Sequence, residues 1–266
     1  MIAMESTVEK LKDFVKDNQT NILIAGAVAG TAALGYYGVK KALHQKEKSN
    51  ELRDVYDSQF TAQNLPLYAT EAALRERVLS NVTYDLVVNL NSAERYSGRV
   101  RVSFMVSEAA TQDDISKLFI DFHGELVSEL MINDTLVPWS SINFNKHRIY
   151  LGSDLILPHQ INHVMVKFTN TFVNNSAGLH RYVDPKDNEA YVFSHLEPFF
   201  CHRWFPCFDQ PSLRAPFRLS VISPDTHWQV ISNGKKTSSL PLSDHGAQKL
   251  LEELGYEEAF LNLEEP

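Results

Sequence analysis

Apolar and polar residues alternate through most of the middle of the chain, with the two-residue period of half-buried β-strands. Valine, leucine, tyrosine and phenylalanine recur at every second position in 82–90 and 100–106. Shorter runs of the same kind cover 118–122, 149–151, 164–168, 217–221 and 228–231. Short strands with one apolar and one polar face predict a mainly β fold, an antiparallel β-sandwich, rather than a parallel α/β sheet.

Helical patterns flank this region on both sides. The run EAALRERVL at 71–79 predicts a short helix before the first strand. The run AQKLLEEL at 247–254 predicts another, with Asp244 as its N-cap. Residues 235–266, which hold this second helix and end in an acidic stretch, are expected to form a tail distinct from the β-domain.

An apolar run near the front of the chain has a different character. No charged residue occurs from Asn18 to Val39, and lysines stand on both sides of the run. A helix rises about 1.5 Å per residue, so the run is long enough for the core of a bilayer. The pattern predicts one transmembrane helix over 18–43, behind an amphipathic segment, 1–17, and before a charged linker, 44–61. A buried helix of a soluble domain is the alternative.

Two glycines within this predicted helix are candidates for helix packing. Gly26 and Gly30 form a G-x-x-x-G pair, and small residues at that spacing let a second helix approach closely in lipid. Membrane lipid and the helices of other integral-membrane proteins are therefore expected partners.

Composition and charge narrow the classes of function. Of the 266 residues 44% are hydrophobic, enough for a packed core, and the net charge of −8 disfavours nucleic acid as a partner. The two cysteines, Cys201 and Cys207, are too few for a disulfide scaffold or a structural zinc site. We expect two reduced thiols; a disulfide or a lone metal contact is the alternative.

Four motifs follow one another between residues 178 and 217. They are GLHRYVDP at 178–185, YVFSHLEP at 191–198, CHRWFPCFDQP at 201–211 and RAPF at 214–217. In this order they resemble the amino-terminal domain of the aminopeptidase N family of zinc metallopeptidases. The resemblance covers roughly residues 62–234 and implies a saddle-like β-domain that packs on a zinc-binding catalytic domain.

The resemblance also implies roles for individual residues. Glu197 falls on the glutamate that helps to hold the free amino group of the substrate, and His195 falls where the family has a glutamine in the first side-chain pocket. Without opposing groups, we interpret both as relics of a substrate site. The CHRWFPCFDQP motif is interpreted as structural, with Asp209 capping its turn or pairing with Arg203. The structural residues are Arg203, Phe205, Pro206, Cys207, Phe208 and Asp209.

The sequence has no counterpart of the zinc site with which the family catalyses its reaction. A zinc peptidase of this type needs H-E-x-x-H on a helix, and none of the ten histidines is followed by glutamate. No nucleophile elbow or Gly-rich phosphate loop occurs either. We therefore expect no catalytic residue, no metal, no cofactor and no small-molecule substrate.

The expected function is that of a catalytically inactive, membrane-anchored accessory subunit of a larger membrane complex, in the mitochondrial inner membrane. Its β-domain would serve as an interaction surface, because a face that meets a catalytic domain in the family would otherwise lack cover. Two alternatives stay open: a residual peptide-binding module, and half of a split aminopeptidase whose zinc domain is another chain.

Overall fold

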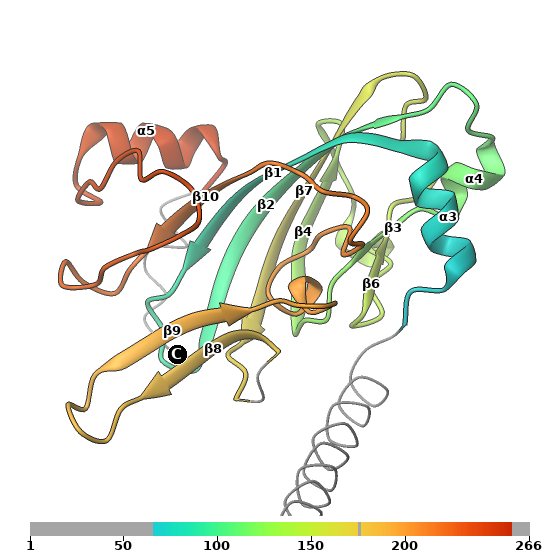
Figure 1. Cartoon of the computed structure of the whole chain (residues 1–266). Coiled ribbons are helices and arrows are strands. Elements are labelled where there is room, and N and C mark those ends of the chain that lie inside the picture. The colour runs from blue at the N-terminus through green and yellow to red at the C-terminus, as the bar shows by residue number, and fades with distance from the viewer. Residues whose placement is uncertain (1–65, 175–176, 257–266) are drawn as a thin grey trace, which may run out of the picture. The chain divides into compact units, whose positions relative to one another are not determined.

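A curved six-stranded sheet dominates the computed structural model, which describes residues 66–174 and 177–256 (Figure 1). Its strands lie in the order β10-β1-β2-β7-β4-β5. They are β1 (Leu79–Asn89), β2 (Arg95–Val106), β4 (Leu126–Ile132), β5 (Thr135–Leu136), β7 (Ile161–Thr171) and β10 (Phe217–Ile222).

Two small antiparallel sheets accompany the large one. One pairs β3 (Phe119–Asp121) with β6 (Arg148–Tyr150), and the other pairs β8 (Gly178–Val183) with β9 (Ala190–His195). Figure 1 shows the β8–β9 hairpin reaching away from the large sheet. The helices are α3 (Ala69–Val78), α4 (Gln112–Ser116) and α5 (His245–Glu253), with 3-10 turns η2 (Trp139–Ser141) and η3 (Cys201–Arg203).

The main core lies on one face of the large sheet. Alternate residues of β1, β2 and β7 point to this face, and many of them are fully buried, among them Leu86, Val100, Phe104 and Val166. The opposing layer comes from β3, β6 and the segment that follows η3, which supplies Trp204, Phe205 and Phe208. The period-2 pattern of the sequence therefore has its expected cause, burial of one face of each strand.

The opposite face of the sheet is largely charged, and α5 covers part of it. Arg99, Lys167 and Glu129 lie side by side on β2, β7 and β4, and both cations contact the carboxylate of Glu129. Near β1 and β10 a second small core forms, in which residues of α5 and the residues after it pack against the sheet. Its members are Val87, Ile222, Leu251, Leu254 and Tyr256.

Two features differ from the predicted antiparallel sandwich. The sheet is mixed, because β10 pairs with β1 in parallel, with Tyr84 opposite Phe217. The predicted strand at 228–231 is wrong: these residues form no strand, and Ile231 is 88% exposed. Alternating apolar residues form a strand only where one face can be buried against a neighbour. Residues 228–231 are not buried, so the pattern did not correspond to a strand.

The predicted membrane helix, 18–43, with Gly26 and Gly30, lies outside the described residues, as do the segments 1–17 and 44–61. Within 66–174 and 177–256 no helix has the length and apolar character needed to cross a bilayer.

Candidate functional site

The segment from Leu196 to Phe217 includes the CHRWFPCFDQP motif, and its backbone is held by β3 and by two tyrosines of the large sheet. Cys207 exchanges two backbone hydrogen bonds with Asp121 of β3, of 2.9 and 3.0 Å. The hydroxyl of Tyr84 accepts from the amide of Phe208 at 2.9 Å, and that of Tyr96 donates to the carbonyl of Trp204 at 2.9 Å. Tyrosines of β1 and β2 thus satisfy backbone groups that burial would otherwise leave without partners.

Side chains of the motif are buried in the core. Phe205 meets Tyr84 edge-to-face at 5.8 Å, and Phe208 meets Phe104 in the same way at 5.4 Å. Arg203 is 3% exposed, with its guanidinium over the ring of Phe200 at 6.0 Å. Pro206 is buried as well. Phe205 and Phe208 therefore form part of the main core.

Asp209 stabilises the turn at η3. Its carboxylate accepts from the backbone amide of His202 at 3.0 Å and contacts Nδ1 of the same residue at 2.6 Å. The expected capping role is therefore present, and His202 provides the ring partner. The amide of Asp209 in turn donates to Asp121, whose carboxylate also accepts from Arg75 at 2.7 Å. Burial raises the pKa of Asp121, although the Arg75 guanidinium opposes this shift.

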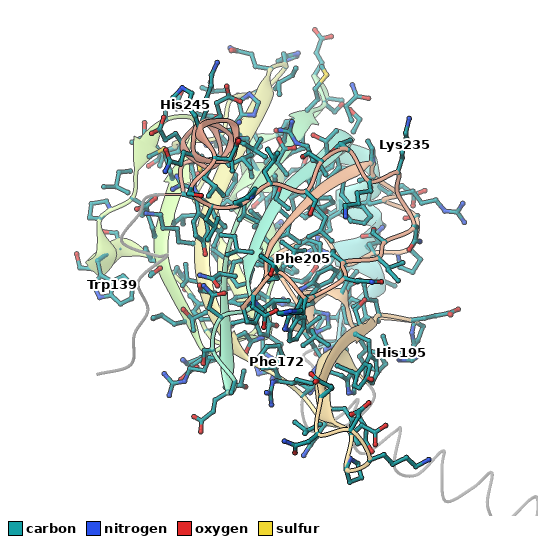
Figure 2. All side chains as sticks on the ribbon, turned by 90° about the vertical axis from the view of Figure 1, so that its left-hand side faces the viewer. Trp139, Phe172, His195, Phe205, Lys235 and His245 are labelled. Atoms are coloured by element: carbon teal, nitrogen blue, oxygen red, sulfur yellow. The ribbon has the colours of Figure 1, made fainter. Side chains whose placement is uncertain are left out.

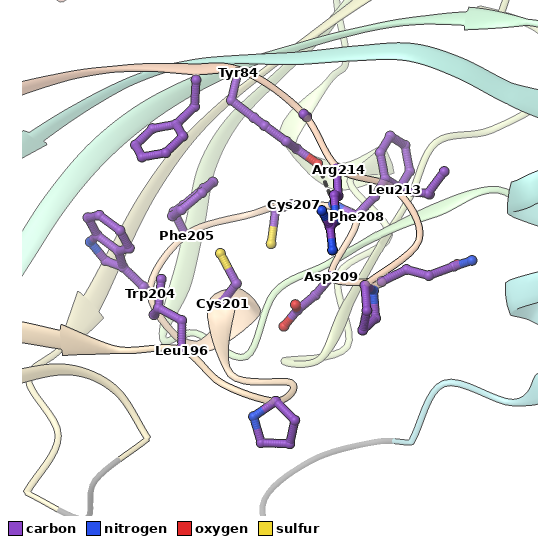
Figure 3. Close-up of a pocket in the computed structure, with 15 residues that line it drawn as sticks. Tyr84, Leu196, Cys201, Trp204, Phe205, Cys207, Phe208, Asp209, Leu213 and Arg214 are labelled. Atoms are coloured by element: carbon purple, nitrogen blue, oxygen red, sulfur yellow. Dashed lines mark hydrogen bonds between the residues drawn. The ribbon is translucent and has the colours of Figure 1, made fainter. Parts of the chain in front are cut away.

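A cavity of about 300 Å³ lies between this segment and the start of β10 (Figure 3). Its wall is mainly apolar and aromatic, which is the usual character of ligand sites. The lining residues are Tyr84, Leu196, Pro198, Cys201, Trp204, Phe205, Cys207, Phe208, Asp209, Gln210, Pro211, Leu213, Arg214, Ala215 and Phe217. The thiols of Cys201 and Cys207 point toward one another in this wall.

The β8–β9 hairpin carries a row of aromatic residues on one face. Tyr182 lies opposite Tyr191 and His180 lies opposite Phe193, and alternate residues of a strand share a face. We call Tyr182, Tyr191, Phe193 and His180 the aromatic stripe. The rings of His180 and Phe193 stack at 5.0 Å, whereas Tyr182 and Phe193 are each 52% exposed. Exposed rings gathered on one face are typical of interaction surfaces.

His195 and Glu197, the predicted relics of a substrate site, lie where β9 ends. Both are exposed, and neither lines the cavity, although Leu196 and Pro198 on either side of Glu197 do. His195 pairs with Gly178 and shares the face of the aromatic stripe. His195 lies at the surface (Figure 2), and both residues stand next to the cavity wall rather than in it.

The structure also brings together two histidines, His123 and His147, which the sequence analysis did not single out. Nδ1 of His123 is 3.0 Å from Nδ1 of His147, so the N–H of one ring donates a hydrogen bond to the other. Burial and then the charge of His147 lower the pKa of His123 to about 3. The residues are 24 positions apart and in different segments, and no local spacing signals their contact.

The donor groups do not fit a metal. Among the described residues no group of three histidine, cysteine or acidic side chains is placed to hold an ion. His202, which lies near the histidine pair, is engaged by Asp209.

Fold and motif together define a class: an amino-terminal β-domain of a metallopeptidase, without the zinc-binding helix. Residues 80–250 match the family model of the peptidase M1 N-terminal domain. The chain belongs to this family, and the resemblance to aminopeptidase N is confirmed to that extent. The matched region is the non-catalytic N-terminal domain of these peptidases.

The relatives are whole aminopeptidases. The chain is 32% identical over 166 residues to aminopeptidase N of Streptomyces lividans, a match covering 61% of this chain and 18% of the relative. It is 24% identical over 188 residues to mitochondrial aminopeptidase 2 of Saccharomyces cerevisiae, covering 62% and 19%. The chain thus spans about a fifth of the length of these relatives.

Parts of two solved structures align with part of this chain. The M1 zinc metallopeptidase of Deinococcus radiodurans aligns with a TM-score of 0.40 and 20% identity, over 55% of this chain and 32% of that one. A native yeast LTA4 hydrolase aligns with a TM-score of 0.46 and 21% identity, over 56% and 23%.

Proposed function

We propose that this chain is a catalytically inactive, membrane-anchored accessory subunit of a larger membrane protein complex of the mitochondrial inner membrane. Its β-domain serves as the interaction surface, and its partners are membrane lipid and other integral-membrane subunits. The proposal of an anchor rests on the uncharged run at 18–39 of the sequence, and that of inactivity on the missing H-E-x-x-H.

The aromatic stripe is the observation that carries the interaction role. Tyr182, Tyr191 and Phe193 are 52%, 48% and 52% exposed on one face of a projecting hairpin. Tyrosine and phenylalanine are enriched at protein interfaces, where they bury large area with few rotatable bonds. Exposing them in water brings no such gain, which favours a surface covered by a partner.

The loop at the tip of the β8–β9 hairpin adds negative charge to this surface. Asp184, Asp187 and Glu189 stand in the loop with a single cation, Lys186. Asp187 also accepts from the hydroxyl of Tyr191 at 2.9 Å, so the acidic tip and the stripe are joined. A partner segment with apolar side chains and a few lysines or arginines would complement both features.

Native membranes solubilised in a mild detergent provide the test, by native gel and mass spectrometry. We expect the chain to migrate with a set of integral-membrane subunits that lack H-E-x-x-H. Replacing Tyr182 and Phe193 together by serine should release it from that assembly. Trp139→Ser is the matched control, because this ring is 62% exposed but lies on η2, away from His195 in Figure 2. Migration alone, or with a single zinc-peptidase chain, would contradict the proposal.

A residual peptide-binding role is the second candidate, and the position of Glu197 favours it. This exposed carboxylate stands between two residues of the cavity wall, at the end of the strand that carries the stripe. A peptide with a free amino terminus should then bind more tightly than its acetylated form, and Glu197→Gln should abolish the difference. Equal binding of both peptides would exclude this role.

A further inference from the structure

The two cysteines of the chain meet in the wall of the cavity. Different hydrogen bonds fix the backbone at each of them. Cys201 begins η3, and its carbonyl accepts from the amides of Trp204 and Phe205. Cys207 is anchored to β3 by its two backbone hydrogen bonds with Asp121. Figure 3 shows the two sulfur atoms pointing toward one another, and the structure has both as free thiols.

We propose that Cys201 and Cys207 form an oxidisable dithiol, which a hydroperoxide converts reversibly into a disulfide across the cavity wall. The Cys201 thiolate attacks one oxygen of the hydroperoxide, the O–O bond breaks, and an alcohol or water leaves after taking up a proton. Cys201 is then a sulfenic acid. The sulfur of Cys207 displaces the hydroxyl group, which leaves as water with the Cys207 proton, and the S–S bond forms. A small dithiol reduces the disulfide to two thiols by exchange and is itself oxidised to a disulfide.

The surroundings assign different roles to the two thiols. Cys201 is half-buried and lines a cavity of about 300 Å³, ample room for a small hydroperoxide. Cys207 is 2% exposed, so an oxidant does not reach it directly. Burial first, and then a hydrogen bond with Cys201, raises the pKa of the Cys207 thiol, which therefore stays protonated. Cys201 is accordingly the attacking residue and Cys207 the resolving one.

Oxidation would join η3 covalently to the residue that bridges to β3. The closed ring spans residues 201–207, and the loss of loop entropy in the unfolded chain should raise the Tm by about 5 °C. Because both cysteines line the cavity, its wall would change with the redox state. This inference does not depend on the accessory-subunit role, so each can fail without the other.

Peptide mapping of the full chain tests the proposal. The protein is treated with hydrogen peroxide under native conditions, then alkylated and digested with trypsin. Cleavage after Lys186, Arg203 and Arg214 separates the two cysteines. We expect peptides 187–203 and 204–214 joined, two hydrogens lighter than their sum, and separated again by dithiothreitol. Recovery of both thiols alkylated, a sulfinic acid on Cys201 without a link, or links only between chains would overturn the proposal.

Two serine variants test the order of events. In Cys207→Ser, dimedone should trap a sulfenic acid on Cys201, because the resolving sulfur is missing. In Cys201→Ser, Cys207 should give neither a dimedone adduct nor a disulfide. An adduct on Cys207 at a comparable rate would overturn the assigned roles. If a variant fails to fold, trapping is done on the native chain with dimedone present during oxidation, where an adduct on Cys207 has the same meaning.

Discussion

Arg75 has an environment that its position in the sequence does not suggest. In a helix of charged residues it looks like a surface side chain, yet it is 1% exposed. Its guanidinium donates to Asp121 and to the carbonyl of Phe119 at 2.9 Å, and lies 4.2 Å from the centre of the Phe119 ring. Asp121 also receives the amide of Asp209. One buried ion pair thereby joins α3, β3 and the motif segment.

Replacing Arg75 by methionine keeps an unbranched apolar stem and removes the guanidinium with its charge. The Asp121 carboxylate would then be buried without its cation, so we expect the free energy of unfolding to fall by about 3–5 kcal/mol. Urea unfolding measures this loss. The double variant with Asp121→Asn should lose less than the sum of the two single variants, because they share one interaction. Additive losses would mean that the pair is not coupled.

Among the elements, α5 was predicted together with its cap. Asp244 accepts from the amides of Gly246 and Ala247, and Ala247, Leu251 and Leu254 follow at helical spacing on the buried face. The sequence could not show where this face packs. The structure places it on the outer side of the large sheet, against Val87 and Ile222.

Leu251→Ala should destabilise the fold by about 2–4 kcal/mol, because it removes buried methyl groups from a small cluster. Lys249→Ala, on the exposed side of the same helix, is the matched control and should change stability by less than about 0.5 kcal/mol. Thermal unfolding followed by circular dichroism compares the two. Equal stability of both variants would show that the packing of α5 on the large sheet does not stabilise the fold.

How far the strands could be predicted depended on how regular their pairing is. β2, β7 and the part of β1 that follows its register shift between Ser80 and Thr83 alternate regularly and were found from the sequence. β4 was missed, because a shift in register between Val127 and Glu129 puts Val127 and Leu130, three positions apart, on the buried face. A bulge of this kind breaks the two-residue period. The cavity brings Tyr84 of β1 next to residues 196–217, so no local pattern could assemble it. The aromatic stripe lies within one hairpin, but its common face depends on the register of β8 and β9.

At the scale of the whole molecule, the histidine pair predicts how stability depends on acidity. His123 has a pKa of about 3 in the folded chain, against 6.5 for a free histidine. Between these values the unfolded chain binds more protons than the folded chain. The free energy of unfolding should therefore fall as the pH is lowered from about 6.5 toward 3, and stay constant above 6.5 as far as His123 is concerned.

His123→Asn removes this titration and should flatten the decline relative to the native chain. Urea midpoints measured at several pH values give the comparison. His227→Asn serves as the control, because the side chain of His227 is 95% exposed. A native chain and His123→Asn variant with parallel pH profiles would contradict the assignment.

The parallel pairing of β1 with β10 has a consequence for the order in which the chain is made. β1 is finished at Asn89, whereas its second neighbour begins at Phe217. On the ribosome, β2 can pair with β1 early and β7 with β2, but the other edge of β1 stays unpaired until the last quarter of the chain is synthesised. Closing so long a loop is slow. A nascent chain that stalls before Phe217 therefore presents an open strand edge, which is the species that chaperones bind.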